Sequence, residues 1–359
     1  MAGWRAFYIT QESLSVFADP ATAPADATVF ADTDEGLQSF DDYLSGAPAQ
    51  TSVVVVDVIE EEFAIDQIPK LGWRDRRSLM ARRMQRKFSR TPYRLTTYQG
   101  ASATSREDAT IVHSAISNHE LLDHWLQVML KHEVPLIGVF SVPLMASALL
   151  QRFYKTTAPA LFVTQHQGQR LRQVFLRGGH VQSARLSQSP AVTAADYAEF
   201  VVTEVQRSRR YLERTRALSS IEQLDVYIVA DASLAESVHA QARSHSPMQL
   251  HFIDPQKAAN KIGMTQELQA DRMEALYLCA ALKRRPAKSY AVSGECRFWH
   301  MRRLRHGIIG TAIATAAACS VVAALFLSET WSLHRQSARI ENQMALLTET
   351  FRRENERFD

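Results

Sequence analysis

The chain is poor in cysteine, with Cys279, Cys296 and Cys319 as the only three among 359 residues. They form no CxxC or Cys/His spacing, so neither a structural zinc site nor a disulfide framework is expected. The opening residues, MAGWRAFYITQESLSV, lack a basic stretch followed by an apolar one, so a cleaved secretion signal has no support. The formal net charge is only +3, which argues against a dedicated nucleic-acid-binding protein.

Familiar catalytic motifs are also lacking. The sequence contains neither the phosphate-binding pattern GxxxxGK[ST] nor the hydrolase pattern GxSxG. His119 and His124 flank Glu120, but they are five positions apart, whereas HExxH needs four to place both histidines on one helix face. We therefore expect a helix capped by Asn118 with solvated histidines, and no metal site.

One long run lacks charge altogether. From Gly307 to Leu327 the sequence reads GIIGTAIATAAACSVVAALFL, which as a helix is long enough to cross a ~30 Å hydrocarbon core. A water-soluble core helix of this length normally has a polar stripe, so we predict one transmembrane helix at 307–327. The segment before it is rich in positive charge: Lys283, Arg284, Arg285, Lys288, Arg297, Arg302, Arg303 and Arg305.

The flanking charges predict how the chain is oriented. The residues after Ser328 mix both signs, whereas the preceding segment contains one acid, Glu295, among its many basic residues. Because positive charge is retained in the cytoplasm, we expect a single-pass protein of the bacterial inner membrane with a cytoplasmic N-terminal domain and a periplasmic C-terminus. Trp299 and Trp331 stand near the two expected interfaces, where amphipathic rings are favoured.

Two patterns in the C-terminal region predict helix association. Small residues at four-residue spacing give the span one smooth face: Gly310, Ala314 and Ala318. After the span, an apolar seam follows a seven-residue repeat: Leu333, Ile340, Met344, Leu347 and Phe351. We predict a short coiled-coil stalk over 328–359 and a homo- or hetero-oligomer; the alternative is a solitary helix lying on the membrane.

The N-terminal region contains two similar cycles of elements. Each begins with a short β meander, near Arg5 and again near Ala160, and continues with alternating helices and strands. We predict an α/β cytoplasmic domain over 1–285, with lobe I at about 1–157 and lobe II at about 158–285. A basic juxtamembrane linker, 286–306, then leads to the span.

Several strings within these cycles resemble a known group of proteins. They are VVVVDVIEEEFAIDQIPKLGWRDRRSLMARRMQ, DATIVHSAISNHELLDHWLQVMLKHEVPLIGVFSVPLMASALL and the meander ALFVTQHQGQRLRQVFLRGGHVQSARL. In order and pattern they are similar to the PilM family of type IV pilus machines and to the cytoplasmic domain of the GspL family of type II secretion. The resemblance covers about residues 5–285 and implies a duplicated actin-like, ribonuclease H-like fold. Unlike in the GspL family, no ferredoxin-like domain is expected from residues 328–359, which follow the span.

The resemblance also defines where a nucleotide would bind. Active actin-like proteins use glycine-containing turns whose N–H groups approach the phosphates, and aspartates that organise Mg²⁺. The three corresponding places lack that chemistry here, at Tyr8 and Thr10, at Gln165, and at Ala230 and Asp231. We therefore expect no ATPase activity and no cofactor.

The densest positive charge lies in the segment 73–90, which reads as an amphipathic helix. Its candidate partner-binding residues are Arg76, Arg77, Arg82, Arg83, Arg86 and Arg90. Such a run is a solvated helix face, a surface for an acidic protein, or a contact for anionic lipid or nucleic acid. The low net charge argues against nucleic acid.

The resemblance and the span together lead to one functional hypothesis. They imply a non-catalytic inner-membrane scaffold that couples a cytoplasmic assembly ATPase to a polytopic platform protein and to single-span coiled-coil proteins. Two alternatives remain open from the sequence: an active actin-like ATP-binding protein, and a membrane-tethered sensor.

Overall fold

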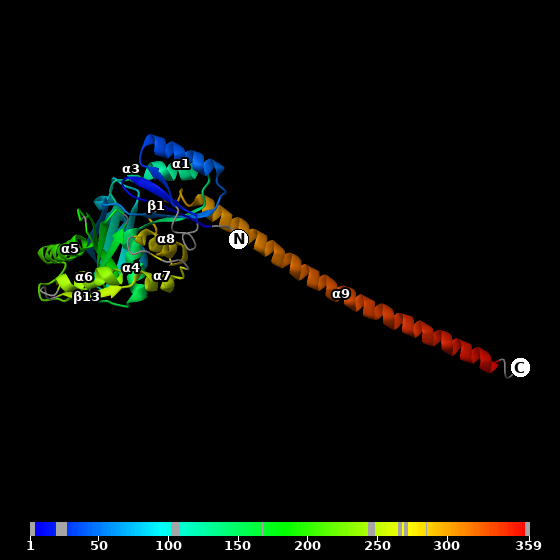
Figure 1. Cartoon of the computed structure of the whole chain (residues 1–359). Coiled ribbons are helices and arrows are strands. Elements are labelled where there is room, and N and C mark those ends of the chain that lie inside the picture. The colour runs from blue at the N-terminus through cyan, green and yellow to red at the C-terminus, as the bar shows by residue number, and fades with distance from the viewer. Residues whose placement is uncertain are drawn as a thin grey trace. The chain divides into compact units, whose positions relative to one another are not determined.

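The computed structural model describes residues 4–18, 27–101, 108–166, 168–191, 193–242, 248–264, 268, 272–284 and 286–355. It divides into two compact units, Met1–Trp299 and His300–Asp359. The elements of both units are labelled in Figure 1.

Lobe I of the first unit is built on a five-stranded sheet. Its strands are β1 (Trp4–Ile9), β2 (Ser13–Phe17), β3 (Thr28–Ala31), β4 (Thr51–Val56) and β8 (Leu136–Ser141), in the order β3-β2-β1-β4-β8. The first three strands are antiparallel, whereas β4 runs parallel to both β1 and β8. Phe7 and Ile9 of β1 pack beneath α1 (Asp34–Gly46) and α3 (Glu120–Lys131). Ala6 and Tyr8 face the opposite side, as the two-residue period of a strand requires.

Lobe II repeats this sheet. Its strands are β9 (Ala160–His166), β10 (Arg170–Arg177), β11 (His180–Gln188), β12 (Leu224–Val229) and β13 (Met248–Ile253), in the order β11-β10-β9-β12-β13. The antiparallel meander and the two parallel strands match those of lobe I position by position. Helices α5 (Ala194–Arg214) and α6 (Ala232–Ala242) cover one face. The predicted duplicated actin-like fold is therefore confirmed.

Three further helices lie at the other sheet faces: α4 (Val142–Phe153), α7 (Pro255–Ile262) and α8 (Met273–Arg284). Helix α8 contacts β1 and β4 of lobe I as well as β9 of lobe II, and α4 contacts β8 and β10. One buried apolar cluster consequently joins residues of both lobes, from Ala6 to Ala281. The two lobes share a core at this face of each sheet.

A small subdomain is inserted between β4 and α3. It contains β5 (Glu61–Pro69), α2 (Trp73–Lys87), β6 (Arg94–Ala101) and β7 (Asp108–Ile116), with the strand order β5-β7-β6. The sequence predicted a helix over 73–90, which α2 confirms, but no strand over the stretch that forms β5. The buried residues of β5 do not alternate regularly with its exposed ones. Its side chains are buried by contacts with β7 and α2 rather than on one sheet face.

Side-chain caps explain where several helices begin. Ser141 caps α4, Asp254 caps α7, and Thr193 forms a reciprocal capping box with Asp196 at α5. Asn118 was predicted to cap α3, but this was wrong, since the N-cap residue is His119 and it makes no side-chain cap bond. His119 contacts Asp123 instead, with 2.7 Å between Nδ1 and Oδ2.

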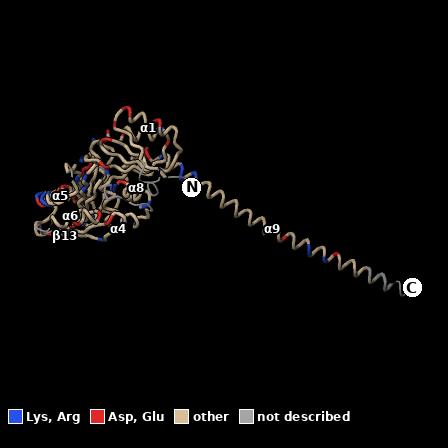
Figure 2. Tube along the Cα trace, in the orientation of Figure 1, with Lys and Arg blue, Asp and Glu red and all other residues tan. Residues whose placement is uncertain are grey.

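The predicted span and stalk belong to one continuous helix, α9 (Arg297–Asn355), of 59 residues. In the described part of the chain it is the one helix long and apolar enough to cross a bilayer. Figure 2 shows its long stretch without charged residues, bounded by charges on both sides. The small-residue face and the apolar seam are exposed on this single helix. Helix association stays a prediction, and the side chain of Phe351 lies outside the described part.

Candidate functional site: a polar cluster between the lobes

The five residues at the expected nucleotide-binding places lie in three parts of the first unit. Tyr8 on β1 is buried, and Thr10 begins the turn from β1 to β2. Gln165 lies in β9, while Ala230 and Asp231 follow β12. Asp231 has a local role, because its Oδ1 accepts the N–H of Leu234 at 2.8 Å at the start of α6.

Tyr8 belongs to a buried group that we call the interlobe cluster. It consists of Tyr8 and Asp57 from lobe I, Thr164, His166 and Arg172 from lobe II, and Tyr277 from α8, each at most 3% exposed. The sequence reasoning singled out only Tyr8. The remaining signal was weak: Thr164 and His166 are polar residues at alternate positions of β9, and Arg172 is one of several polar residues in β10.

Hydrogen bonds connect the cluster across the lobes. The hydroxyl of Tyr8 donates to Oδ2 of Asp57 at 2.9 Å and lies 3.0 Å from Nδ1 of His166. On the other side of that ring, Nε2 is 3.0 Å from the hydroxyl of Thr164. The Thr164 hydroxyl in turn lies 3.1 Å from that of Tyr277, whose ring stacks on His166 with 5.6 Å between centroids.

An ion pair lies at the centre of the cluster. The guanidinium of Arg172 donates to Oδ1 of Asp57 and, at 3.2 Å, to the carbonyl of Val58. Burial by itself would raise the pKa of Asp57, but the charge of Arg172 and the neighbouring His166 lower it to about 2. Burial lowers the pKa of His166 to about 4, and Asp57 only partly opposes this shift. At neutral pH the cluster therefore contains an ionised Asp57, a charged Arg172 and a neutral His166.

The first turn is closed to an anion by its own side chain. The Oγ1 of Thr10 accepts the backbone N–H groups of Glu12 at 3.3 Å and Ser13 at 3.2 Å. The N–H of Thr10 itself donates to the carbonyl of Ser13 at 2.9 Å. A phosphate-binding turn needs such N–H groups free and pointing at the ligand. Here they are used within the turn.

The interlobe cluster is poorly suited to binding a metal ion. In the part of the chain that the structure describes, His, Cys, Asp and Glu side chains form no group of three or more able to hold a metal ion. The interlobe cluster supplies one carboxylate and one imidazole beside a guanidinium, and that positive charge opposes a bound cation. Structural ion pairing is the chemistry that this arrangement supports.

A second buried contact joins lobe I to the residues that precede α9. The carboxylate of Glu61, at the start of β5, accepts from the hydroxyls of Ser141 at 2.6 Å and Tyr290 at 2.7 Å. The N–H of Tyr290 donates to the carbonyl of Val139 in β8 at 2.8 Å. Burial raises the pKa of Glu61 to about 7, although the two hydroxyls partly oppose the shift.

The neighbouring residues extend this contact. Ser289 approaches Gly138 so closely that a Cβ there would lie 2.6 Å from its Oγ, and the same Oγ accepts the N–H of Val139 at 2.8 Å. Tyr93 donates to Oε1 of Glu295 at 3.0 Å. The first part of the predicted linker is therefore packed on lobe I as a defined segment, 288–296, which we call the juxtamembrane segment.

The arginines of α2 divide into two groups. Arg83 donates to both oxygens of Asp66 at 2.7 Å, and the guanidinium of Arg76 lies 4.3 Å from the ring centroid of Tyr98. The other four candidate partner-binding residues, on the helix or just beyond its end, are exposed: Arg77, Arg82, Arg86 and Arg90. The structure thus brings four of the six candidate partner-binding residues to solvent and assigns two to contacts within the subdomain.

These features define a class: a two-lobed actin-like protein with a buried polar cluster between the lobes and an apolar C-terminal helix. Searches found no matching family model and no matching curated protein. Solved structures with similar folds include the "PilM-PilN type IV pilus biogenesis complex", at 13% identity and TM-score 0.47, covering 77% of this chain and 97% of that one.

Two other similar structures come from named organisms. The cytoplasmic domain of EpsL, an inner-membrane component of the type II secretion system of Vibrio cholerae, matches at 8% identity and TM-score 0.41, covering 82% of this chain and 99% of that one. A Bacteroides thetaiotaomicron protein with an actin-like ATPase fold and unknown function matches at 8% identity and TM-score 0.36, covering 78% and 96%.

Replacing one partner of the central ion pair is expected to destabilise the protein strongly. Arg172→Met leaves an ionised Asp57 without its counter-charge, which should lower the free energy of unfolding by about 3–5 kcal/mol. The double variant Asp57→Asn/Arg172→Met should recover most of that loss, because no charge is left buried. Denaturant unfolding followed by circular dichroism measures both.

Arg177→Met, which breaks a partly exposed pair with Glu222, is the control and should lower the free energy of unfolding by about 1 kcal/mol or less. If Arg172→Met lowers the free energy of unfolding no more than Arg177→Met does, the stabilising role of the Asp57–Arg172 pair is contradicted.

Glu61 should make stability depend on pH in a defined window. Its folded pKa of about 7 lies above the ordinary value of 4.5, so the folded protein binds the proton more tightly than the unfolded chain does. The free energy of unfolding should therefore contain a contribution that is full below pH 4.5 and is lost as the pH rises to about 7. Glu61→Gln removes this contribution, so its stability relative to the parent should rise by roughly 2–3 kcal/mol across the window. Glu62→Gln, at the exposed neighbouring position, is the control. Parallel pH profiles for the parent and Glu61→Gln would rule the assignment out.

Proposed function

We propose that the chain is a non-catalytic inner-membrane scaffold of a type IV pilus or type II secretion-like machine. The observation that carries the proposal is the interlobe cluster, which contains Tyr8 and adjoins Gln165 in β9, two of the positions where the resemblance would place a nucleotide. The Asp57–Arg172 ion pair joins the two lobes there, His166 stacks on Tyr277, and Thr10 accepts N–H groups of the first turn. The sequence resemblance to the PilM and GspL families supplies the kind of machine.

Competition for the same groups supports the proposed loss of nucleotide binding. A triphosphate between the lobes would have to displace the Asp57–Arg172 pair, and each freed ion would need a new partner in a buried site. It would also have to break the bonds that Thr10 makes with Glu12 and Ser13. The free energy needed to break these contacts opposes nucleotide binding. We therefore propose that the two lobes act as a rigid adaptor.

Membrane attachment completes the scaffold. Helix α9 spans the inner membrane, with the basic residues around Arg302 on the cytoplasmic side and the residues after Ser328 in the periplasm. The first unit then acts in the cytoplasm. The exposed seam from Leu333 to Leu347 pairs with a second helix, either from another copy or from a single-span coiled-coil partner.

The juxtamembrane segment provides the mechanical connection. Tyr290 and Ser289 bind β8 and Glu61, and Glu61 also binds Ser141, which caps the interlobe helix α4. A displacement of the chain ahead of α9 is therefore passed to a strand of lobe I and to a helix shared by both lobes. We propose that this path transmits position between the membrane and a cytoplasmic assembly ATPase, with a polytopic platform protein as a further partner.

The exposed arginines of α2 form the proposed docking face for the ATPase. Arg77, Arg82 and Arg86 are exposed, whereas Arg83 is occupied by Asp66. An acidic surface on the partner would complement this face, and such complementarity mainly raises the association rate and the specificity.

Titration of ATP with Mg²⁺ into the purified full chain tests the loss of nucleotide chemistry. We expect no saturable heat at millimolar nucleotide and no phosphate release above the blank, because the binding groups are engaged within the protein. A known actin-like ATPase serves as the positive control. Micromolar binding accompanied by turnover would overturn the scaffold proposal in favour of an active ATP-binding protein.

Charge reversal on α2 tests the docking face. The variant Arg77→Glu/Arg82→Glu/Arg86→Glu should reduce capture of an assembly ATPase at least tenfold when the solubilised chain is pulled down and analysed by mass spectrometry. The matched control, Arg210→Glu/Arg214→Glu, changes exposed arginines on α5 and should leave capture unchanged. Equal capture by the α2 variant and the parent would remove this helix from the interface.

A further inference from the structure

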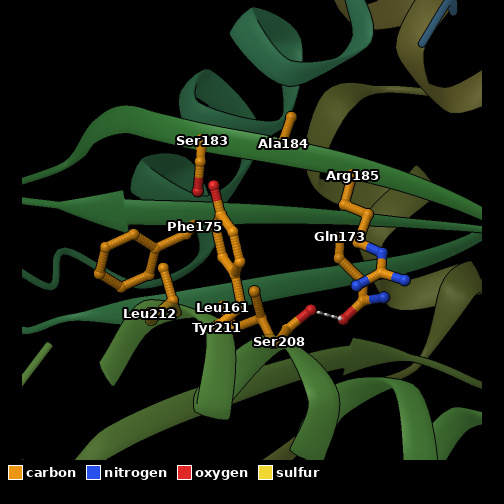
Figure 3. A pocket seen from close by; sticks show the side chains of 9 residues that line it. All are labelled: Leu161, Gln173, Phe175, Ser183, Ala184, Arg185, Ser208, Tyr211 and Leu212. Atoms are coloured by element: carbon orange, nitrogen blue, oxygen red, sulfur yellow. Dashed lines mark hydrogen bonds between the residues drawn. The ribbon is translucent and has the colours of Figure 1, made fainter. Parts of the chain in front are cut away.

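A cavity of about 260 Å³ lies between the sheet of lobe II and α5, on the face of that sheet opposite to the interlobe cluster (Figure 3). The two sites are separated by the period of β10, because Gln173 and Phe175 point into the cavity while Arg172 points to the cluster. The cavity is lined by Leu161, Gln173, Phe175, Ser183, Arg185, Ser208, Tyr211 and Leu212, together with the small Ala184.

Strand register divides this cavity into a polar end and an apolar end. Gln173 of β10 stands directly opposite Arg185 of β11, and Phe175 stands opposite Ser183. Opposed side chains on one sheet face lie close enough to act on the same ligand. Figure 3 shows the Gln173 amide and the Arg185 guanidinium together at one end, with Phe175 and Leu212 at the other.

The amide of Gln173 is incompletely satisfied. Its side chain is 1% exposed, and its Oε1 accepts from the hydroxyl of Ser208 at 2.8 Å. Its Nε2 has no hydrogen-bond partner among the described residues. A buried N–H without an acceptor is costly, so an acceptor placed in the cavity would be bound favourably.

Arg185 adds positive charge beside that amide. Its guanidinium lies 3.5 Å from Oε2 of the buried Glu204, whose other oxygen already pairs with Arg207. Two guanidiniums thus share one carboxylate, and one positive charge is left without a counter-charge within this group. The side chain of Arg185 is 43% exposed, so a ligand can reach it from solvent.

We infer that this cavity binds a carboxylate attached to an apolar, preferably aromatic, group. The planar carboxylate accepts from Arg185 and from the free N–H of Gln173, a geometry that suits a carboxylate better than a neutral carbonyl. The apolar group lies among Leu161, Phe175 and Leu212, beneath the ring of Tyr211. The same chemistry is presented by a free aromatic acid and by a peptide ending in an aromatic residue.

Calorimetric titration of the full chain in nanodiscs tests this inference, with 3-phenylpropionate as the probe. We expect saturable binding in the submillimolar range, and binding at least tenfold weaker for the neutral isostere 3-phenylpropanamide. Acetyl-Ala-Phe with a free carboxylate, compared with its amide, distinguishes the sources: tighter binding than the free acid identifies a peptide C-terminus as the ligand, and weaker binding identifies a small acid.

Variants locate the site. Gln173→Leu and Arg185→Gln should each weaken 3-phenylpropionate at least fivefold, and Ser183→Phe should abolish binding by filling the cavity. Arg177→Gln, on the same strand but outside the cavity, is the matched control and should bind as the parent does. The melting temperature of each variant shows whether it is folded. If the buried variants fail to fold, Arg185→Gln still tests the site, because it alters a partly exposed side chain.

Two outcomes would overturn the inference. One is the absence of saturable binding by both carboxylate probes, which would mean that the cavity holds only water. The other is equal affinity for the acid and its neutral isostere, or unchanged affinity in Arg185→Gln. Neither outcome bears on the scaffold proposal, because the cavity and the interlobe cluster lie on opposite faces of the sheet.

Discussion

The ion pair between Asp57 and Arg172 is the constraint on which the rest of this structure depends. It joins a residue that follows β4 of lobe I to a residue on β10 of lobe II, and both side chains are buried. Two charges removed from water persist only where their mutual attraction and further hydrogen bonds offset the loss of hydration. Tyr8 and the carbonyl of Val58 supply those bonds. The requirement for both charges keeps the two lobes in one relative arrangement.

The duplicated fold explains why the polar residues meet at this point. In each lobe the first strand lies at the centre of the sheet, and alternate residues face the helices shared between the lobes. Tyr8 on β1 and His166 on β9 therefore approach each other from corresponding strands of the two repeats. Aromatic and charged side chains from both repeats occupy this place and are buried there.

The region ahead of α9 is also held by buried contacts. Glu61 contacts both the cap of α4 and Tyr290 of the juxtamembrane segment, so one carboxylate joins the inserted subdomain, the interlobe helix and the chain that leads to α9. Ser289 fits against β8 because Gly138 has no side chain. These contacts fix the juxtamembrane segment to the first unit.

Local sequence patterns were sufficient for much of this description. The uncharged run from 307 to 327 and its basic flank predicted the apolar helix, because a bilayer requires a continuous apolar length. The two β meanders predicted the repeated sheets, because turn residues and alternating burial are local properties. Strand β5 was not predicted, since it forms by pairing with β7, which is about 40 residues further along the chain.

The interlobe cluster was decided only by the tertiary structure. Asp57 and Arg172 are 115 positions apart, and Glu61 and Tyr290 are 229 apart, so no local pattern relates them. The cavity beneath α5 depends on strand register, which sets Gln173 against Arg185. The sequence by itself determined that two repeated lobes precede an apolar helix, because periodicity and hydropathy act over a few turns or strands. Only folding decided which polar groups meet between those lobes, because electrostatic pairing acts through space.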